Sequence, residues 1–283
     1  MTQTPEALRQ EGVSHQNGLE QAIAQYKQSY PFLGLSKNTR SGYTADLAQF
    51  QEYCHAHNIL SAIQLTPEDV ANWRDQLRQG GYAPKTINRK RASLSSFLEW
   101  SQAEGIIQPD FTISLPKRES VEKKQPRALS AEQVGSLISK EKKLRDASLI
   151  LIALTTGANI TEIVNLNAED ILRTEDENTA IRFKGGINKS RPRTLVVDKK
   201  VGSKIAEYIK KLGLKPEDPL FREIYDQRYG RERLTRQGAH LVLKKYGHEI
   251  GVENLNSRML RNTFIASFTG TRRQLDEVLG RRV

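Results

Sequence analysis

The stretch from Leu255 to Val283, LNSRMLRNTFIASFTGTRRQLDEVLGRRV, predicts a helix that carries an arginine within an apolar face. At about 100° per residue, the apolar face is made by Leu260, Phe264, Ile265 and Phe268. Arg261 falls inside this stripe, and Arg258 lies one turn earlier at its edge. An unpaired buried guanidinium is strongly destabilising. Arg261 therefore either pairs with an internal carboxylate or points into a cleft that binds an anion, and the pattern leaves both alternatives open.

The same residues resemble the second signature box of the tyrosine recombinase (phage integrase) family. That box reads His-x-Leu-Arg-His, then Thr/Ser-Phe-Ala-Thr, and later Leu-Gly-His and a nucleophilic tyrosine. This chain has MLRNTFIAS at 259–267 and VLG at 278–280, so Arg261 matches the box arginine. The resemblance places Arg258 and Asn262 at the two histidine positions of the box and Arg281 at the histidine of Leu-Gly-His. The position of the tyrosine falls beyond Val283.

The composition indicates a two-domain protein with a polyanionic partner. The chain has 283 residues and a formal net charge of +11, and its isoelectric point is about 9.7. Charge alone does not separate DNA from RNA or from an acidic membrane surface. Cys54 is the only cysteine, which excludes a disulfide within the chain and a cysteine-based metal site. We expect no metal and no cofactor.

No segment predicts a membrane or a secretory location. The longest clean apolar run, ASLILIAL at 147–154, is far too short to cross a bilayer. The N-terminal MTQTP lacks the basic and apolar regions of a secretion signal. We therefore expect a cytoplasmic, nucleoid-associated protein without a membrane partner.

The first half of the chain predicts a small helical bundle. Residues 1–35 are polar and are interpreted as an N-terminal extension, with a helix-like segment at 18–30 that either docks or stays free. Helical spacing then begins at the capping residue Ser36, and TPED at 66–69 is a strong helix start. A third helix covers 84–104. With short polar connections and no strand-like alternation, 36–109 form a helical domain.

The third helix is the most basic of the three. Its first turns carry Lys85, Thr86, Asn88, Arg89, Lys90 and Arg91. Long cations among short hydrogen-bonding side chains suit a helix that lies against a phosphate backbone. The alternative is an ordinary solvated basic face. The segment at 82–98 resembles the core-binding domain of the same family, where this helix contacts DNA, which favours the first interpretation.

Residues 110–129 are interpreted as a cationic linker, and 130–283 as a second domain. A capping box at Ser130 begins this domain, and an apolar helix at 146–156 forms its core. Strands at 180–183 and 194–197 flank a hairpin tip at 184–193. The predicted fold is mainly α: an N-terminal helical core-binding (SAM-like) domain, and a C-terminal α/β domain of the tyrosine-recombinase catalytic type with a small β-sheet.

The resemblance also implies which catalytic groups are present. Where the family has Thr-Gly-Leu-Arg-x-Ser/Thr-Glu, this chain has TGANITE at 156–162, which puts Asn159 at the first arginine. In the family, two arginines neutralise the scissile phosphate and a hairpin lysine, matched here by Lys189, protonates the leaving 5′ oxygen. The retained positions are Lys189 and Arg261, and the replaced ones are Asn159, Arg258, Asn262 and Arg281. Loss of an arginine and of the nucleophile removes several kcal/mol of transition-state stabilisation and the covalent route.

From these positions we expect a protein that is not an enzyme. It would bind duplex DNA and act by occupying its site, as a transcriptional regulator or architectural factor, alone or with a second copy on DNA. The alternative is an active site-specific recombinase whose tyrosine comes from a partner or from residues beyond 283. Neutral drift at the replaced positions also remains open. The expected DNA contacts are Lys85, Thr86, Asn88, Arg89, Lys90, Arg91, Lys184, Lys189, Arg191, Arg193, Arg236, Arg258, Arg261 and Arg281.

Overall fold

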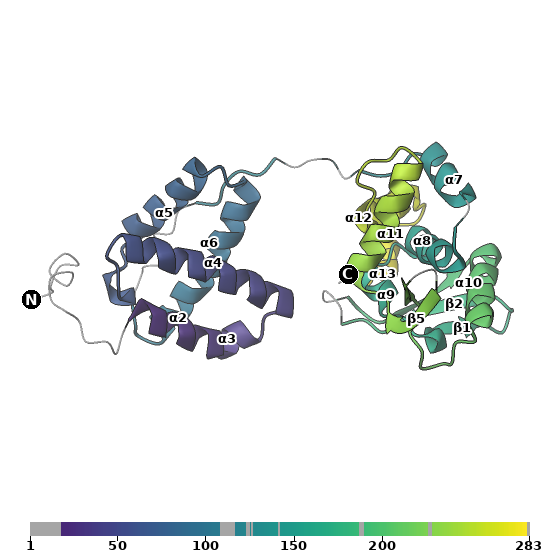
Figure 1. Ribbon diagram of the computed structural model, residues 1–283, viewed down its shortest axis with the longest axis horizontal. Helices are drawn as coiled ribbons and strands as arrows, with labels where there is room; N and C mark the ends of the chain where they lie inside the picture. Colours follow the sequence, from purple (N-terminus) through teal and green to yellow (C-terminus); the bar gives the residue numbers. More distant parts are fainter. Residues whose placement is uncertain are drawn as a thin grey trace, which may run out of the picture. The chain divides into compact units, whose positions relative to one another are not determined.

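The computed structural model describes residues 18–107, 117–122, 125, 127–140, 142–186, 190–225 and 228–281. The chain forms two compact units that divide between Lys123 and Lys124, inside the segment predicted as a linker (Figure 1). Both units are mainly helical, and small antiparallel sheets occur in the second. This agrees with the predicted fold class.

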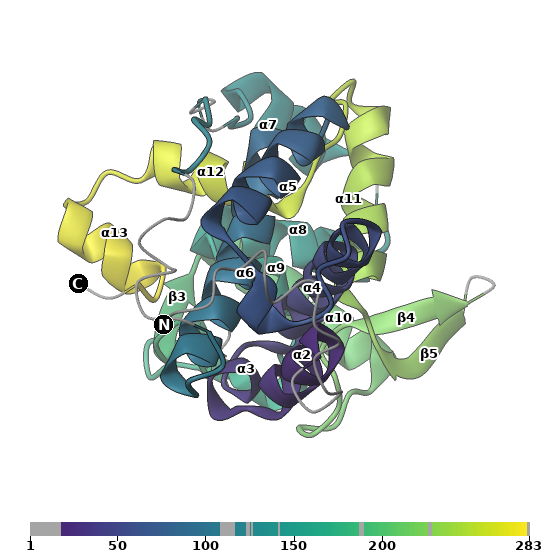
Figure 2. The ribbon, with the colours of Figure 1, turned by 90° about the vertical axis from the view of Figure 1, so that its left-hand side faces the viewer.

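The first unit is a bundle of helices. Its elements are α2 (Leu19–Gln28), α3 (Tyr30–Leu33), α4 (Lys37–Ala56), the short 3-10 helix η2 (Ala62–Gln64), α5 (Pro67–Gln79) and α6 (Pro84–Ala103). In Figure 2, α4, α5 and α6 lie in the foreground. Ser36 accepts a hydrogen bond from the Thr39 backbone N–H at 3.2 Å and so caps α4. Thr66 and Asp69 form a capping box at the predicted start of α5, with Pro67 at its first position.

Aromatic side chains fill the core of this unit. Tyr26 lies 5.7 Å from Phe97 between ring centroids, and Phe50 lies 4.9 Å from Trp73. Leu19, Ile23 and Tyr26 of α2 are buried in the same cluster. Helix α2 therefore docks into the bundle, whereas the sequence assigns it to an extension before residue 36. Its apolar residues were visible in the sequence, but only the tertiary contact shows what they cover.

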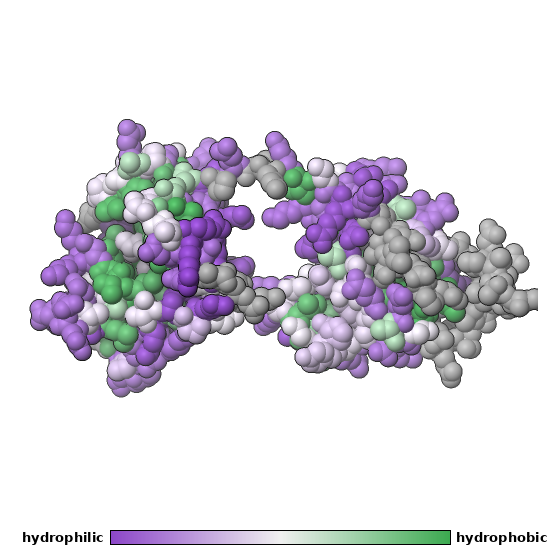
Figure 3. Space-filling model, turned by 180° about the vertical axis from the view of Figure 1, so that it is seen from behind, coloured by the Kyte–Doolittle hydropathy of each residue, from purple (hydrophilic) through white to green (hydrophobic). Residues whose placement is uncertain are grey.

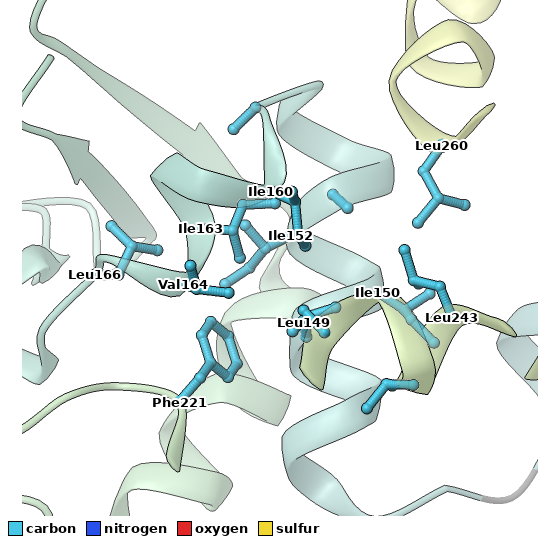
Figure 4. Packing of buried hydrophobic residues seen from close by; sticks show 14 of the residues in the cluster. Leu149, Ile150, Ile152, Ile160, Ile163, Val164, Leu166, Phe221, Leu243 and Leu260 are labelled. Carbon is cyan, nitrogen blue, oxygen red and sulfur yellow. The ribbon is translucent and has the colours of Figure 1, made fainter. Parts of the chain in front are cut away.

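The helices of the second unit surround one apolar cluster. They are α7 (Ala131–Ser139), α8 (Leu144–Thr156), α9 (Ile160–Val164), α10 (Lys199–Leu212), α11 (Arg236–Glu249), α12 (Ser257–Ser267) and α13 (Arg272–Val278). In Figure 4, Ile152 of α8 and Ile163 of α9 point into a common interior, together with Leu243 of α11 and Leu260 of α12. Helix α8 ends at Gly157, whose φ of 58° is left-handed as expected for a C-terminal glycine cap.

A three-stranded antiparallel sheet carries the predicted hairpin. After the 3-10 turn η4 (Ala168–Asp170), β1 (Ile171–Arg173) pairs with β2 (Thr179–Phe183), which pairs with β3 (Arg193–Val197). The register of the hairpin places Phe183 opposite Arg193. A separate two-stranded sheet joins β4 (Arg222–Tyr225) and β5 (Arg228–Arg233) and was not predicted. Its strands are rich in charged residues and lack apolar alternation, so no local pattern indicates a strand there.

The visible surface is largely hydrophilic, with smaller hydrophobic patches (Figure 3). Among the described residues, no helix has the length and apolar character needed to cross a membrane.

Candidate phosphate site and basic surfaces

Arg261 lies in the second turn of α12. Asn256 caps this helix and accepts a hydrogen bond from the Met259 N–H at 3.1 Å. The Arg261 guanidinium donates through Nη1 to the carbonyl oxygen of Gly157 at 2.6 Å. The sequence left two alternatives open for Arg261, a pair with an internal carboxylate or a place in an anion-binding cleft. Among the described residues, no carboxylate pairs with it.

Burial above all lowers the pKa of Arg261, and the positive charges of Arg281 and Arg193 act in the same direction, whereas Glu162 opposes them. Arginine still remains protonated at neutral pH. The result is a half-buried cation whose remaining N–H donors are available to an anion.

The turn at Gly157 sets the position of the carbonyl that Arg261 binds. A Cβ at this residue would lie 2.3 Å from Phe264 Cδ1 and 2.9 Å from Leu279 Cδ2. The close approach of α12 and of the chain after α13 therefore requires glycine, as does the positive φ. This contact explains how the ends of α8, α12 and α13 meet around Arg261.

Asn159, which stands at the position of the family's first arginine, brings no positive charge to the site. It caps α9, accepting from the Glu162 N–H at 2.9 Å and donating through Nδ2 to Glu162 Oε2 at 2.8 Å. Glu162 in turn forms a two-pronged ion pair with Arg193, with Nη1 to Oε1 at 2.7 Å and Nη2 to Oε2 at 3.1 Å. Only 6% of the Arg193 side chain and 3% of the Glu162 side chain are exposed. Arg193 is thus an interior residue, not the exposed hairpin cation that the sequence predicts.

Burial by itself raises the pKa of Glu162, but hydrogen bonds and charge from Arg193 outweigh it, helped by the Asn159 backbone N–H. The pKa of Glu162 consequently lies below its ordinary value of 4.5. A fully paired buried carboxylate of this kind is ionised at neutral pH.

Of the other replaced positions, Arg258 and Asn262 lie on α12, and Arg281 follows α13. Arg258 is exposed, and Asn262 donates through Nδ2 to the Arg127 carbonyl at 3.0 Å. Arg281 donates to Asp276 at 3.2 Å and is 39% exposed. Arg281 lies near enough to Arg261 to affect its pKa, whereas no described interaction links Arg258 to either. Lys189 lies outside the described residues, so its predicted role stays a prediction.

The remaining cations expected on this unit are exposed. Lys184 follows β2 and pairs with Glu169 at 3.0 Å and with Asp170 at 3.4 Å. Arg191 and Arg236 are exposed, the latter at the first position of α11. Their contacts with DNA stay predictions.

Helix α6 of the first unit does not present a uniform cationic face. Lys90 is buried, with 7% of its side chain exposed, and its ammonium contacts the buried carboxylate of Asp46 at 3.0 Å. Arg89 binds the same carboxylate but is about half exposed. Lys85 is exposed, whereas Thr86 and Arg91 are partly buried. The expected position of Lys90 is therefore corrected: at helical spacing it falls on the side that packs against α4, where Asp46 compensates its charge.

Asn88 contacts the chain after α6. Its Nδ2 donates to the Glu119 carbonyl at 2.9 Å and its Oδ1 accepts from the Glu119 N–H at 2.8 Å. Arg78 binds the Glu119 carboxylate through Nε at 3.1 Å and Nη2 at 3.0 Å. The Asn88 amide, expected to contact DNA, is occupied in this structure by Glu119, a residue of the predicted linker.

Three acidic residues that organise these surfaces were not singled out from the sequence: Asp46, Glu119 and Glu162. A local signal existed only for Glu162, because Asn159 and Glu162 have the spacing of a capping box. The partners of Asp46 and Glu119 lie more than 30 positions away along the chain, and no local pattern reveals them. In the described ranges, no group of three or more His, Cys, Asp or Glu residues is arranged to hold a metal ion.

Both units match known families. Residues 23–105 match the phage integrase N-terminal SAM-like domain, and residues 127–275 match the phage integrase family. The tyrosine recombinase XerC of Roseiflexus castenholzii is 31% identical over 240 residues, which cover 81% of this chain and 74% of the relative. XerC of Herpetosiphon aurantiacus is 28% identical over 257 residues, covering 87% of this chain and 80% of the relative.

Solved structures show the same fold. A XerH site-specific recombinase in a post-cleavage complex with a palindromic difH substrate has a TM-score of 0.71 and 20% identity, covering 94% of this chain and 78% of that chain. A lambda integrase tetramer bound to a Holliday junction also has a TM-score of 0.71, with 13% identity, covering 95% of this chain and 76% of that chain. At these identities the likeness concerns the fold alone.

These relatives correct the functional expectation drawn from the replaced residues. The prediction that this chain is not an enzyme is wrong, because relatives that match most of it are named tyrosine recombinases, which are enzymes. The error came from treating single motif positions as decisive, when the match extends over both units.

Proposed function

This chain belongs to the phage integrase family, and from that premise we propose that it is a site-specific DNA recombinase of the Xer type. In this proposal it binds duplex DNA and cuts and rejoins strands. The attacking tyrosine comes from a partner chain or from residues that follow Val283 in a longer protein. The partners are double-stranded DNA and further copies of the chain on that DNA.

The observation that carries the proposal is the state of Arg261. Its guanidinium is half-buried, its pKa is lowered chiefly by burial, and its one described hydrogen bond goes to the Gly157 carbonyl. A desolvated cation of this kind is stabilised by an anion that takes up its free donors. Arg281 adds a second positive charge nearby, although Asp276 offsets part of it. A single phosphate of the DNA backbone that contacts both Arg261 and Arg281 fits this arrangement.

The exposed cations support contacts to further phosphates. Lys85 on α6, and Arg191 and Arg236 on the second unit, are exposed. Each can neutralise a backbone phosphate without reading sequence. Arg89 is about half exposed and shares the single Asp46 carboxylate with Lys90, so the two cations together leave one positive charge uncompensated. Buried Lys90 and Arg193 are left out of this set, since their charges are already compensated by Asp46 and Glu162.

The reaction assigned to this site is a transesterification. The tyrosine hydroxyl loses its proton as its oxygen attacks the scissile phosphorus. The bond from phosphorus to the 5′ oxygen breaks, and that oxygen takes up a proton to leave as a hydroxyl, so the step consumes no net proton. Arg261 stabilises the charge that develops on the non-bridging oxygens. The covalent link is reversed when a 5′ hydroxyl of another strand attacks it, so no energy source is needed.

A plasmid assay tests the proposal. DNA fragments that the full-length protein selects by binding are cloned as two directly repeated copies, and deletion of the DNA between them is scored in cells. We expect deletion with the natural protein and loss of deletion with Arg261→Ala. Arg173→Ala is the control, because this side chain is 75% exposed and pairs only with Glu177 among described residues. Persistence of deletion in Arg261→Ala, or no deletion at any bound site, would contradict the proposal.

A further inference from the structure

We propose that Arg193 is a positioning residue that fastens the chain segment 278–281 beside Arg261. We call this segment the exit segment. The effect of Arg193 on catalysis rests on the proposed function. Whether Arg193 holds the exit segment is tested separately, without DNA. Figure 2 shows β3, which begins at Arg193, next to the end of α13.

The contacts of Arg193 tie three parts of the second unit together. Its Nη1 and Nη2 bind the two oxygens of Glu162 at 2.7 and 3.1 Å, which fixes the plane of the guanidinium. Its Nε donates to the Val278 carbonyl at 2.6 Å. The Phe183 ring lies under the guanidinium at 4.6 Å from its centroid. A planar guanidinium can make these contacts at once, whereas an ammonium cannot.

The backbone of the exit segment is held from the hairpin as well. The Arg191 N–H donates to the Gly280 carbonyl at 2.9 Å, and the Arg281 N–H donates to the Asp276 carbonyl at 2.7 Å. Gly280 has a φ of 66°, and a Cβ there would lie 2.7 Å from Arg193 Nη1 and 3.1 Å from the Arg191 carbonyl oxygen. The chain thus passes so close to Arg193 that only glycine fits.

The fastened segment is part of the surroundings of Arg261. Leu279, which is 1% exposed, lies against Gly157, and the Gly157 carbonyl accepts the hydrogen bond of Arg261. Arg281, the last described residue, also acts on Arg261 through its charge. Releasing the Val278 carbonyl would therefore let both Leu279 and Arg281 move relative to Arg261.

The consequence follows from how steeply reaction rates depend on geometry. A displacement of about 1 Å at a reacting centre lowers a rate by about 100-fold. Arg193 does not touch the substrate in this proposal; it acts through the position of the exit segment. Its replacement should slow chemistry on bound DNA more than it weakens binding.

The first test uses Arg193→Lys, with Arg182→Lys as the matched control. Arg182 binds the buried carboxylate of Asp170 through Nε at 3.1 Å and Nη2 at 3.0 Å on the neighbouring strand, away from the exit segment. Amide hydrogen exchange is measured on the free proteins. We expect the amides of 278–281 to exchange about tenfold faster or more in Arg193→Lys and to be unchanged in the control. Unchanged protection of 278–281 in Arg193→Lys would overturn the proposal.

Gly280→Ala keeps the test decisive if Arg193→Lys fails to fold. The added Cβ would lie 2.7 Å from Arg193 Nη1 and 3.1 Å from the Arg191 carbonyl oxygen, at a residue whose φ is 66°. Either the exit segment or the Arg193 guanidinium must therefore shift, so a local loss of protection is again expected. Protection of 278–281 at the natural level in a folded Gly280→Ala protein would equally overturn the proposal.

The second test separates positioning from a merely structural role. On a bound DNA duplex, the rate of covalent attachment should fall about tenfold or more in Arg193→Lys, while the dissociation constant changes by less than about twofold. Weaker binding with an unchanged attachment rate would show that Arg193 does not position the reacting groups. If the natural protein gives no attachment, the proposed function fails, and the exchange experiment still decides whether the exit segment is fastened.

Discussion

At the scale of single residues, Glu162 is a buried carboxylate that joins α9 to Arg193 at the start of β3. It accepts from Arg193 through both oxygens and from the N-terminal turn of α9. Because its pKa in the folded protein lies below 4.5, the unfolded chain takes up a proton first as pH falls. Its stabilising contribution is therefore complete at neutral pH and is lost on acidification through the folded-state pKa.

Glu162→Gln should lower the free energy of unfolding by about 3–5 kcal/mol at pH 7, because it leaves Arg193 buried without a counter-charge. The difference from the natural protein should shrink as pH is lowered through the folded-state pKa of Glu162, where the natural carboxyl also becomes protonated. Urea unfolding across this pH range measures both. Glu177→Gln is the control, since Glu177 is 78% exposed and its ion pair contributes little. A difference that is independent of pH would refute the assigned ionisation.

Lys90 and Lys85, five positions apart on α6, should behave in opposite ways. Lys90→Met removes one partner of the buried Asp46 carboxylate and should cost about 3 kcal/mol of unfolding free energy. Lys85→Met should change stability by less than about 0.5 kcal/mol, because this side chain is exposed, but should weaken DNA binding. Denaturant unfolding and DNA titration give the two readouts. Equal effects of the two substitutions on stability would contradict the burial of Lys90.

At the scale of elements, α6 contributes to the core of the bundle and also binds a residue of the predicted linker. Asn88 binds both backbone polar groups of Glu119, and Arg78 of α5 binds its carboxylate. Glu119, which lies inside the predicted linker, is thereby held against the first unit.

Asn88→Ala should release the linker around Glu119 without altering the DNA sequence preference, since the Asn88 amide is already engaged. Trypsin should then cleave after the exposed Lys117 and Arg118 about tenfold faster. Ser95→Ala is the matched control on α6, because Ser95 bonds only Glu99 among described residues and does not contact the linker. An altered base preference in Asn88→Ala, with natural cleavage kinetics, would show instead that Asn88 contacts a DNA base and does not hold the linker.

The elements that sequence predicts well are those with local signals. Capping residues fix the starts of α5 and α7, and Gly157 fixes the end of α8. The hairpin of β2 and β3 follows from β-branched residues around a polar tip. The β4–β5 sheet leaves no local pattern. Helix α2 shows its apolar spacing in the sequence, but whether it docks depends on tertiary contacts. The same limit hid the pair of Arg193 with Glu162, whose members lie 31 positions apart.

At the scale of the whole molecule, the net charge of +11 sets the expected character of DNA binding. The logarithm of affinity should fall linearly with the logarithm of salt concentration, because each phosphate contact releases counterions. Arg261→Ala should reduce the magnitude of that slope by about one, equally on different DNA sequences. Arg261→Lys should keep the slope while lowering affinity, since it retains the charge but loses the guanidinium geometry. Identical slopes for the natural protein and Arg261→Ala would remove Arg261 from the phosphate contacts.

The most direct measurement of the central claim is covalent attachment of the full-length protein to a DNA duplex that it binds. The duplex carries a nick close to the cleavage point, so that the cut strand diffuses away and the intermediate accumulates. We predict a protein–DNA species that survives denaturation, contains a phosphotyrosine link, and is absent with Arg261→Ala. A tightly bound duplex that never yields such a species would show that the chain is not a recombinase.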